Sequence, residues 1–228
     1  MENKELRYNP INWRVVSDAE NNDTRTIKGT AIVFNSRSEL LNEQGIRFYE
    51  TITPEAVTRE LIEKSDIVML YNHKKDAGVL ARSKNGIGSL RINITDEGVD
   101  YEFEAKNTAL GNEVLESVKR GDLDSCSFAF YVRDGGDKWA KEGSVYLRTI
   151  NEISMLTDFS IVINPAYSAT NCNSRGLDSL IETEAKAQRL IDAEALEVQR
   201  IQDIEAVELK ESALEAYYLN LKNIVNSL

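Results

Sequence analysis

The distribution of glycine and proline divides this 228-residue chain into two parts. All three prolines and all twelve glycines lie at or before Gly176, and none follows it. Because these two residue types most often interrupt helices and form turns, residues 177–228 are predicted to form one long helix. Residues 1–176 keep the turn-forming residues that a folded domain needs, so we expect the first domain to end at residue 176.

The predicted helix is acidic and carries an apolar stripe. Residues 177–228 hold eleven acidic and five basic residues, a net charge of -6 in a chain whose net charge is -11. Apolar residues recur at alternating steps of four and three at Leu214, Tyr218, Leu221, Val225 and Leu228. This spacing is typical of a helix that buries one face in a coiled coil or in a partner's groove. A helix that folds back on its own domain would show the same spacing.

Residues 1–176 are predicted to form mostly strands. Apolar and β-branched runs predict strands at residues 24–34, 66–71, 123–132, 146–153 and 156–163, and the clearest hairpin spans residues 90–103 around a turn at 95–98. Helices are predicted to begin at Thr53-Pro54 and at Thr108, the second ending at Gly121. Strands and helices do not alternate regularly, so these elements favour an α+β domain with a mainly antiparallel β-barrel.

Composition and charge exclude several classes of function. No stretch approaches the roughly 18 apolar residues that cross a bilayer, and the first residues lack a signal-peptide core, so we expect a cytoplasmic chain with no membrane partner. Cys126 and Cys172 lie far apart and accompany a single histidine, so we expect no metal site and no cofactor. The acidic charge, with an isoelectric point near 4.8, disfavours nucleic acid as a partner.

The only histidine is the first candidate for chemistry. His73 follows the apolar run at residues 66–71, where a loop would leave its side chain free to act. Imidazole accepts and returns a proton near neutral pH, so a hydrolase that uses a histidine must here use His73. A lone histidine is more often structural or merely exposed, and its position by itself does not decide between these roles.

The predicted strand at residues 123–132 carries candidate nucleophiles. Strand alternation places Ser125, Ser127 and Ala129 on one face, which leaves room for a substrate. Cys126 shares the other face with two phenylalanines, which indicates a small residue buried in a core. A Cys126–His73 pair nevertheless remains an alternative nucleophile and base. Considered by itself, Ser127 is an ordinary strand hydroxyl bonded to its neighbours.

Five segments between about residues 25 and 170 form an ordered set. They are IKGTAIVF (27–34), ETITPEA (50–56), YNH (71–73) with Gly78 following, RGD (120–122) leading to SFAF (127–130), and DFSIV (158–162) closing on PAY (165–167). None is specific by itself. Their order and spacing together resemble the prohead protease family of tailed bacteriophages, assembly proteases thought to share the fold of the herpesvirus assemblins.

The resemblance implies a serine endopeptidase with His73 and Ser127 as catalytic residues, and it places the acidic position of the last motif at Asp158. The chemistry agrees, because a serine hydroxyl needs a base, and that base needs a third group to hold its tautomer. Glu152 lies six residues before Asp158, and in one unbroken strand both carboxylates would face the same way, so Glu152 is the alternative third member. The herpesvirus enzymes use a second histidine there, which this chain lacks.

The resemblance also implies a setting and partners. It implies a barrel domain of herpesvirus-protease type at residues 1–176 that acts inside the immature procapsid in the host cytoplasm. Expected substrates are the scaffold, the scaffolding segment of the major capsid protein, and the protease itself. The tail at residues 177–228 would tether the enzyme among scaffold helices, and a homodimer is plausible by analogy. Two alternatives are a catalytically idle assembly protein that kept the fold and a cysteine peptidase that uses Cys126.

Overall fold

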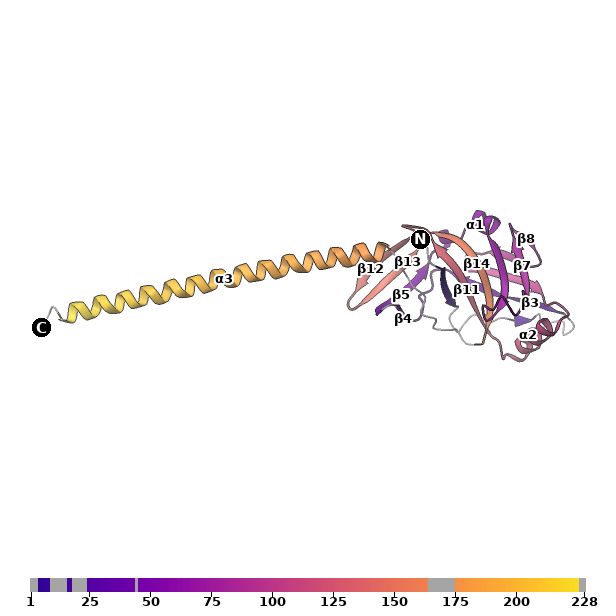
Figure 1. Ribbon diagram of the computed structural model, residues 1–228, viewed down its shortest axis with the longest axis horizontal. Coiled ribbons are helices and arrows are strands. Elements are labelled where there is room, and N and C mark those ends of the chain that lie inside the picture. The colour runs from indigo at the N-terminus through magenta and orange to yellow at the C-terminus, as the bar shows by residue number, and fades with distance from the viewer. Residues whose placement is uncertain (1–3, 9–15, 18–23, 44, 164–174, 226–228) are drawn as a thin grey trace. The chain divides into compact units, whose positions relative to one another are not determined.

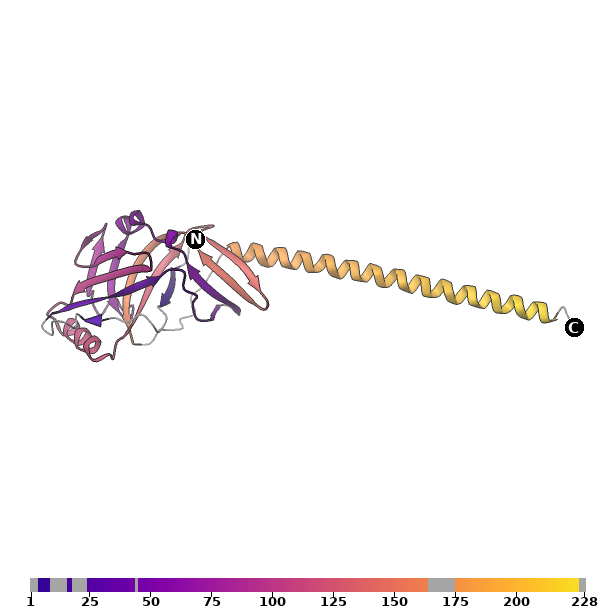
Figure 2. The same cartoon turned by 180° about the vertical axis from the view of Figure 1, so that it is seen from behind.

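The computed structural model describes residues 4–8, 16–17, 24–43, 45–163 and 175–225, and all statements below concern these residues (Figure 1). The fold is of mixed α+β class, mainly strands followed by a long helix, as the sequence predicted (Figures 1 and 2). By its internal contacts the chain divides into one unit at Met1–Asp178 and a second at Ser179–Leu228. The strands all belong to the first unit.

The strands form three sheets. The first sheet has the order β1 (Lys4–Tyr8), β11 (Ser125–Val132), β14 (Ile153–Val162), β6 (Asp66–Tyr71), β7 (Ala81–Lys84), β8 (Ile87–Gly88). The second has the order β2 (Val16–Ser17), β3 (Thr26–Val33), β10 (Gly98–Glu104), β9 (Arg91–Ile94). The third has the order β12 (Asp137–Glu142), β13 (Val145–Ile150), β5 (Ile46–Ile52), β4 (Leu41–Glu43).

Most of the pairings are antiparallel, as predicted. Among the described strands, β14 with β6 and β13 with β5 pair in parallel, and the remaining pairs are antiparallel. Strand pairing within these residues gives three sheets and no closed barrel, so the predicted barrel is not confirmed and stays a prediction.

The hairpin at residues 90–103 is confirmed as β9 and β10. Val99 pairs with Ile94 and Tyr101 with Ile92. Val99, Tyr101 and Phe103 are fully or almost fully buried, so alternate side chains of β10 enter the core as the pattern indicated. Burial of each large apolar side chain contributes about 1.5–3 kcal/mol, which makes this alternation a strong determinant of register.

The helix predicted at residue 108 is confirmed. Helix α2 (Ala109–Arg120) begins at Thr108, whose hydroxyl accepts a hydrogen bond from the Gly111 N–H. It ends at Gly121, whose φ of 78° lies in the left-handed region where glycine avoids the clash of a Cβ. Both ends were therefore readable from local sequence signals.

The helix predicted from Thr53 is divided in two, which corrects the sequence interpretation. A short 3₁₀ helix η1 (Pro54–Ala56) is followed by helix α1 (Arg59–Lys64). Between them Val57 is extended, and the Thr58 hydroxyl accepts from the Leu61 N–H to start α1. Thr53 makes no cap hydrogen bond with its side chain. A helix that starts at Thr58, a second N-cap residue that follows β-branched Val57, is favoured over one continuous helix from Thr53.

The boundary predicted between the last two strands was also wrong. The sequence placed Ile153 in the strand that starts near residue 146, but β13 ends at Ile150 and Ile153 begins β14. The N–H groups of Asn151 and Glu152 both donate to the Gly136 carbonyl, and these two residues belong to neither strand. Several other strands, including β1 and β12, were not predicted.

Helix α3 (Arg175–Val225) contains 51 residues, about 75 Å of helix at a rise of 1.5 Å per residue. It confirms the predicted helix for residues 177–225. Leu228, the PAY segment at 165–167 and Cys172 lie outside the described residues. No helix in the described part of the chain is long and apolar enough to cross a membrane.

Candidate active site

The loop after β6 places the histidine. Asn72 and His73 have φ values of 50° and 56°, in the left-handed region that non-glycine residues seldom adopt. Two hydrogen bonds hold this turn against β14: the Asn72 N–H donates to the Ile161 carbonyl, and the His73 N–H donates to Ser160 Oγ. The chain thus reverses directly after the strand, and the imidazole of His73 lies beside β14 and β11.

The imidazole bridges a serine and an aspartate. His73 Nε2 lies 2.7 Å from Ser127 Oγ, and His73 Nδ1 lies 2.5 Å from Asp158 Oδ1. The register explains the convergence, because Ala129 pairs with Asp158 while Ser127 pairs with Ser160 on the neighbouring strand. His73 therefore meets Ser127, which is 54 residues away in sequence, and Asp158, which is 85 residues away, across three adjacent strands, β11, β14 and β6. The sequence expectation that His73, Ser127 and Asp158 come together matches these contacts.

Glu152 lies outside this group. It precedes β14, its carboxylate is half exposed and forms an ion pair of 2.9 Å with Arg133. The expectation that Glu152 and Asp158 face the same way fails because the strand is interrupted. Ala129 pairs with Asp158 but Phe130 pairs with Leu156, and a second register shift follows, so two β-bulges interrupt the alternation.

The local charges keep Asp158 ionised. Its side chain is fully buried, which favours the neutral acid, but hydrogen bonds from His73 and Lys4 and the charges of both hold the pKa of Asp158 below its ordinary value of 3.8. At neutral pH the carboxylate therefore accepts a hydrogen bond from His73 Nδ1–H. In that tautomer Nε2 carries no proton and can accept the one on Ser127 Oγ.

Cys126 occupies the opposite face of β11 and belongs to the core. It is 1 % exposed, and burial raises the pKa of its thiol to about 12, against a favourable contact with the Tyr101 hydroxyl. A thiol that stays protonated at neutral pH is a poor nucleophile. This environment does not favour the cysteine peptidase alternative.

Two residues of the site were missed by sequence reasoning. Ser160 is fully buried, and its hydroxyl lies 3.1 Å from His73 Nδ1 and 3.4 Å from Asp158 Oδ1. Its position two residues after Asp158, on the same face of the strand, was a signal that could have found it. Lys4 Nζ lies 2.9 Å from Asp158 Oδ2, across 154 residues of sequence, and no local pattern points to it.

The described residues include no group of three or more histidine, cysteine, aspartate or glutamate side chains arranged to hold a metal ion. What the site offers is a hydroxyl, an imidazole and a buried carboxylate in line. This arrangement can move a proton from the hydroxyl to the imidazole while the carboxylate stabilises the imidazolium that forms. Such chemistry activates an oxygen nucleophile for acyl transfer.

A family model of the caudovirus prohead serine proteases matches residues 13–183, three quarters of the chain, and includes His73, Ser127 and Asp158. The chain belongs to this family. The resemblance drawn from five short segments is thereby confirmed, as is the expected enzyme class, a serine protease of a tailed phage that acts in capsid maturation. Neither the curated proteins nor the solved structures yielded a match.

Proposed function

We propose that this protein is a capsid maturation endopeptidase in which Ser127 is the nucleophile, His73 the general base and acid, and Asp158 the group that orients the imidazole. One observation carries the proposal: the only imidazole in the chain lies 2.7 Å from a hydroxyl and 2.5 Å from a buried carboxylate. The membership of the chain in a serine protease family supports these roles.

The proposed mechanism follows from the proton positions. Ser127 Oγ attacks the scissile carbonyl carbon, and its proton passes to His73 Nε2. Asp158 Oδ1 accepts the Nδ1–H bond and stabilises the imidazolium. His73 then gives the proton to the departing amine, the C–N bond breaks, and an acyl-enzyme remains. Water attacks that ester with the same imidazole as base, which releases the carboxylate product and restores Ser127.

The substrates we propose are the scaffold, the scaffolding segment of the major capsid protein, and the protease itself, cleaved inside the immature procapsid in the host cytoplasm. The support is the family, whose members act in prohead maturation and so meet these components of the procapsid. A homodimer stays a prediction by analogy with related assembly proteases. Activity that begins only inside an assembling shell would confine cleavage to components packaged with the enzyme.

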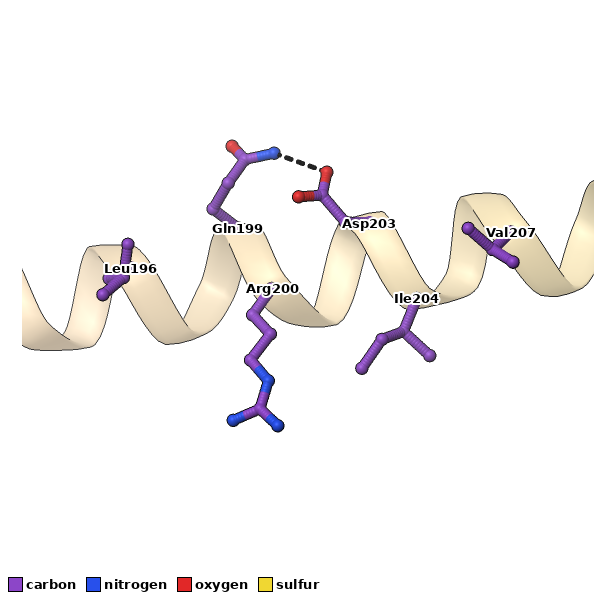
Figure 3. A pocket seen from close by; sticks show the side chains of 6 residues that line it. All are labelled: Leu196, Gln199, Arg200, Asp203, Ile204 and Val207. Atoms are coloured by element: carbon purple, nitrogen blue, oxygen red, sulfur yellow. Dashed lines mark hydrogen bonds between the residues drawn. The ribbon is translucent and has the colours of Figure 1, made fainter.

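We further propose that residues 1–176 are the protease domain and that the tail at 177–228 docks the enzyme onto a scaffold helix. Apolar side chains along α3 are half exposed or more: Leu190, Ile191, Leu196, Val198, Ile204, Val207, Leu209 and Leu214. Figure 3 shows Arg200 and Ile204 projecting on one side, while Gln199 donates a 3.0 Å hydrogen bond to Asp203 on the other. Exposed apolar groups at this density favour a partner.

The proposal is tested by expressing the chain together with the phage's major capsid protein and scaffold, and measuring the masses of all three proteins. Cleavage products should appear with the wild-type chain and with Cys126→Ala, and should be absent with Ser127→Ala. Processing that persists in Ser127→Ala would leave only the idle assembly protein as a role. Processing lost in Cys126→Ala but kept in Ser127→Ala would instead identify a cysteine peptidase.

A further inference from the structure

The amino-terminal strand contacts the proposed triad at two points. Strand β1 is the edge strand of its sheet and pairs with β11, so that Leu6 is opposite Ala129. Ser127 Oγ lies 2.7 Å from the Arg7 carbonyl, to which it can donate, and Lys4 Nζ lies 2.9 Å from Asp158 Oδ2. Strand β1 thus contacts Ser127 and Asp158, the two outer members of the proposed triad, although both lie more than a hundred residues away in sequence.

The register shows how Lys4 reaches a carboxylate two strands away. Leu6, Ala129 and Asp158 lie in one row across β1, β11 and β14, and paired residues point to the same face. Lys4 is two residues before Leu6 and shares that face. Its four-carbon arm therefore extends across β11, the strand between β1 and β14, to reach Asp158.

The two oxygens of Asp158 have separate partners. Oδ1 faces His73 Nδ1, whereas Oδ2 accepts from Lys4 Nζ at 2.9 Å and from Thr157 Oγ1 at 3.2 Å. Because both oxygens are bound, the carboxylate cannot rotate without breaking a hydrogen bond. The carboxylate is fully buried, and a buried charge without compensation is strongly unfavourable. The lysine supplies that compensation, weakened by solvent because its side chain is 36 % exposed.

We propose that Lys4 is a positioning residue of the protease: it fixes the second oxygen of Asp158 and keeps the carboxylate ionised, so that the first oxygen holds the His73 imidazole in its reactive tautomer. This inference rests on the proposed triad. Lys4 touches no reacting atom and acts through Asp158. Through Lys4, strand β1 contributes to the site, although no sequence motif indicated this strand.

The groups around the Asp158 carboxylate predict in which direction its hydrogen bond to His73 changes when Lys4 is replaced. Among the described residues, the titratable groups bonded to Asp158 are His73 from the loop after β6 and Lys4 from β1. Hydrogen bonds from His73 and Lys4 and the charges of both hold the pKa of Asp158 below its ordinary value against the effect of burial. Without Lys4 the buried carboxylate is ionised less favourably and holds the His73 Nδ1–H more weakly. The hydrogen bond between His73 and Asp158 should therefore weaken when Lys4 is replaced by a neutral residue.

The single histidine allows a direct test by NMR, because an untagged full-length chain has one imidazole, whose Nδ1–H bonded to Asp158 gives one proton signal at neutral pH. In Lys4→Met this signal should move upfield, because its hydrogen bond to Asp158 weakens, and Lys4→Gln should agree with it. Lys4→Arg keeps the charge and should restore the wild-type signal. Leu6→Ala, on the same face of the same strand, is the matched control and should leave the signal in place.

A second measurement connects the coupling to reactivity. A fluorophosphonate reacts when the serine oxygen displaces fluoride from phosphorus and the serine proton passes to the imidazole. The second-order rate constant at neutral pH should fall about tenfold or more in Lys4→Met and recover in Lys4→Arg, as for other groups that orient a reactive residue.

An unchanged Nδ1–H signal in both Lys4→Met and Lys4→Gln would overturn the inference, as would an equal change of the signal in Leu6→Ala, which would indicate a merely structural role. The two proposals fail separately. If the wild-type chain does not react with the fluorophosphonate at Ser127, the proposed function fails. If the wild-type chain reacts and the Lys4 variants match it in rate and in the position of the Nδ1–H signal, only the role of Lys4 is lost.

Discussion

Two adjacent residues on β11 illustrate how the face of a strand decides chemistry. Cys126 points into the core, where burial raises the pKa of its thiol to about 12. Ser127 points to the other face and meets His73. A thiol is intrinsically the better nucleophile, yet here it is buried and protonated while the weaker hydroxyl has a base beside it. The environment, and not the residue type, selects the candidate nucleophile.

The two candidate carboxylates make a first prediction. Asp158→Asn should lower the second-order rate constant for the fluorophosphonate reaction by about 10³–10⁴-fold, because an amide cannot hold the reactive tautomer of His73. Glu152→Gln is the matched control and should stay within about twofold of wild type, since its partner is the exposed Arg133. The rates are measured by intact mass against time. A larger loss in Glu152→Gln than in Asp158→Asn would reverse the assignment.

At this scale the sequence predicted part of the site. Alternation on β11 correctly separated Ser127 from Cys126, and the family resemblance singled out His73 and Asp158. Lys4 could not be predicted, because its contact depends on the pairing of β1 with β11 and of β11 with β14. Such a contact exists only once the sheet order is known.

Strand β1 is fastened to the third sheet by a buried ionic cluster on the face opposite the triad. Arg7 Nε lies 2.6 Å from Glu50 Oε1, Arg148 Nη1 lies 2.9 Å from Glu50 Oε2, and Arg148 Nη2 lies 2.9 Å from Glu5 Oε1. Burial would raise the pKa of Glu50, but the charges of and hydrogen bonds from Arg7 and Arg148 outweigh it and hold that pKa below its ordinary value. The cluster keeps β1, and with it Lys4, in place.

The cluster should be costly to break. Arg148→Met removes one of the two arginines that pair with the buried carboxylates of Glu5 and Glu50, and should lower the free energy of unfolding by about 3–5 kcal/mol, measured by urea titration. Arg82→Met is the control, because the Arg82–Asp66 pair is exposed and should contribute less than about 1 kcal/mol. Equal effects of the two substitutions would mean that the buried cluster does not hold the strand.

The same cluster predicts a dependence of stability on pH. The pKa of Glu50 is lowered in the folded chain from an ordinary value of 4.5, so its ionised form is favoured by folding. Its contribution is complete above the unfolded pKa and is lost as the pH falls through the lower folded pKa. Urea titrations should show wild-type stability declining as the pH drops below about 4.5, and the decline should be smaller in Arg148→Met. A flat profile in the wild type would contradict this account.

Elements that rest on local signals were predicted well. The β9–β10 hairpin and helix α2 follow from alternation, a turn and two caps, all within a few residues of one another. The bulges in β14 and the split helix at Val57 depend on competition between alternatives that the pattern does not rank. The mixed charges of β1 did not indicate a strand, because most partners of its charged side chains lie in distant elements.

For the whole molecule, the division into two units places the candidate site in one unit and most of the long helix in the other. His73, Ser127 and Asp158 all lie within the unit Met1–Asp178, and α3 supplies almost all of the other. The absence of glycine and proline after Gly176 predicted this helix, because nothing in that stretch interrupts it. The role of α3 could not be predicted from spacing, since the same stripe fits a coiled coil, a groove or the chain's own domain.

Deletion of residues 177–228 tests the tether. The shortened chain should keep its fluorophosphonate rate within about twofold of the full chain, because no proposed catalytic group is removed. Its incorporation into procapsids should be abolished, as measured by quantitative mass spectrometry of purified particles. Normal incorporation of the shortened chain would refute the tether while leaving the protease assignment untouched.

The most direct measurement of the central claim is the site of reaction with a fluorophosphonate in the purified full-length chain. We predict one added phosphonyl group per molecule, located by peptide mass spectrometry on Ser127, and no addition in a folded His73→Ala variant at the same pH and time. Addition at another serine, or an undiminished reaction at Ser127 without His73, would contradict the account.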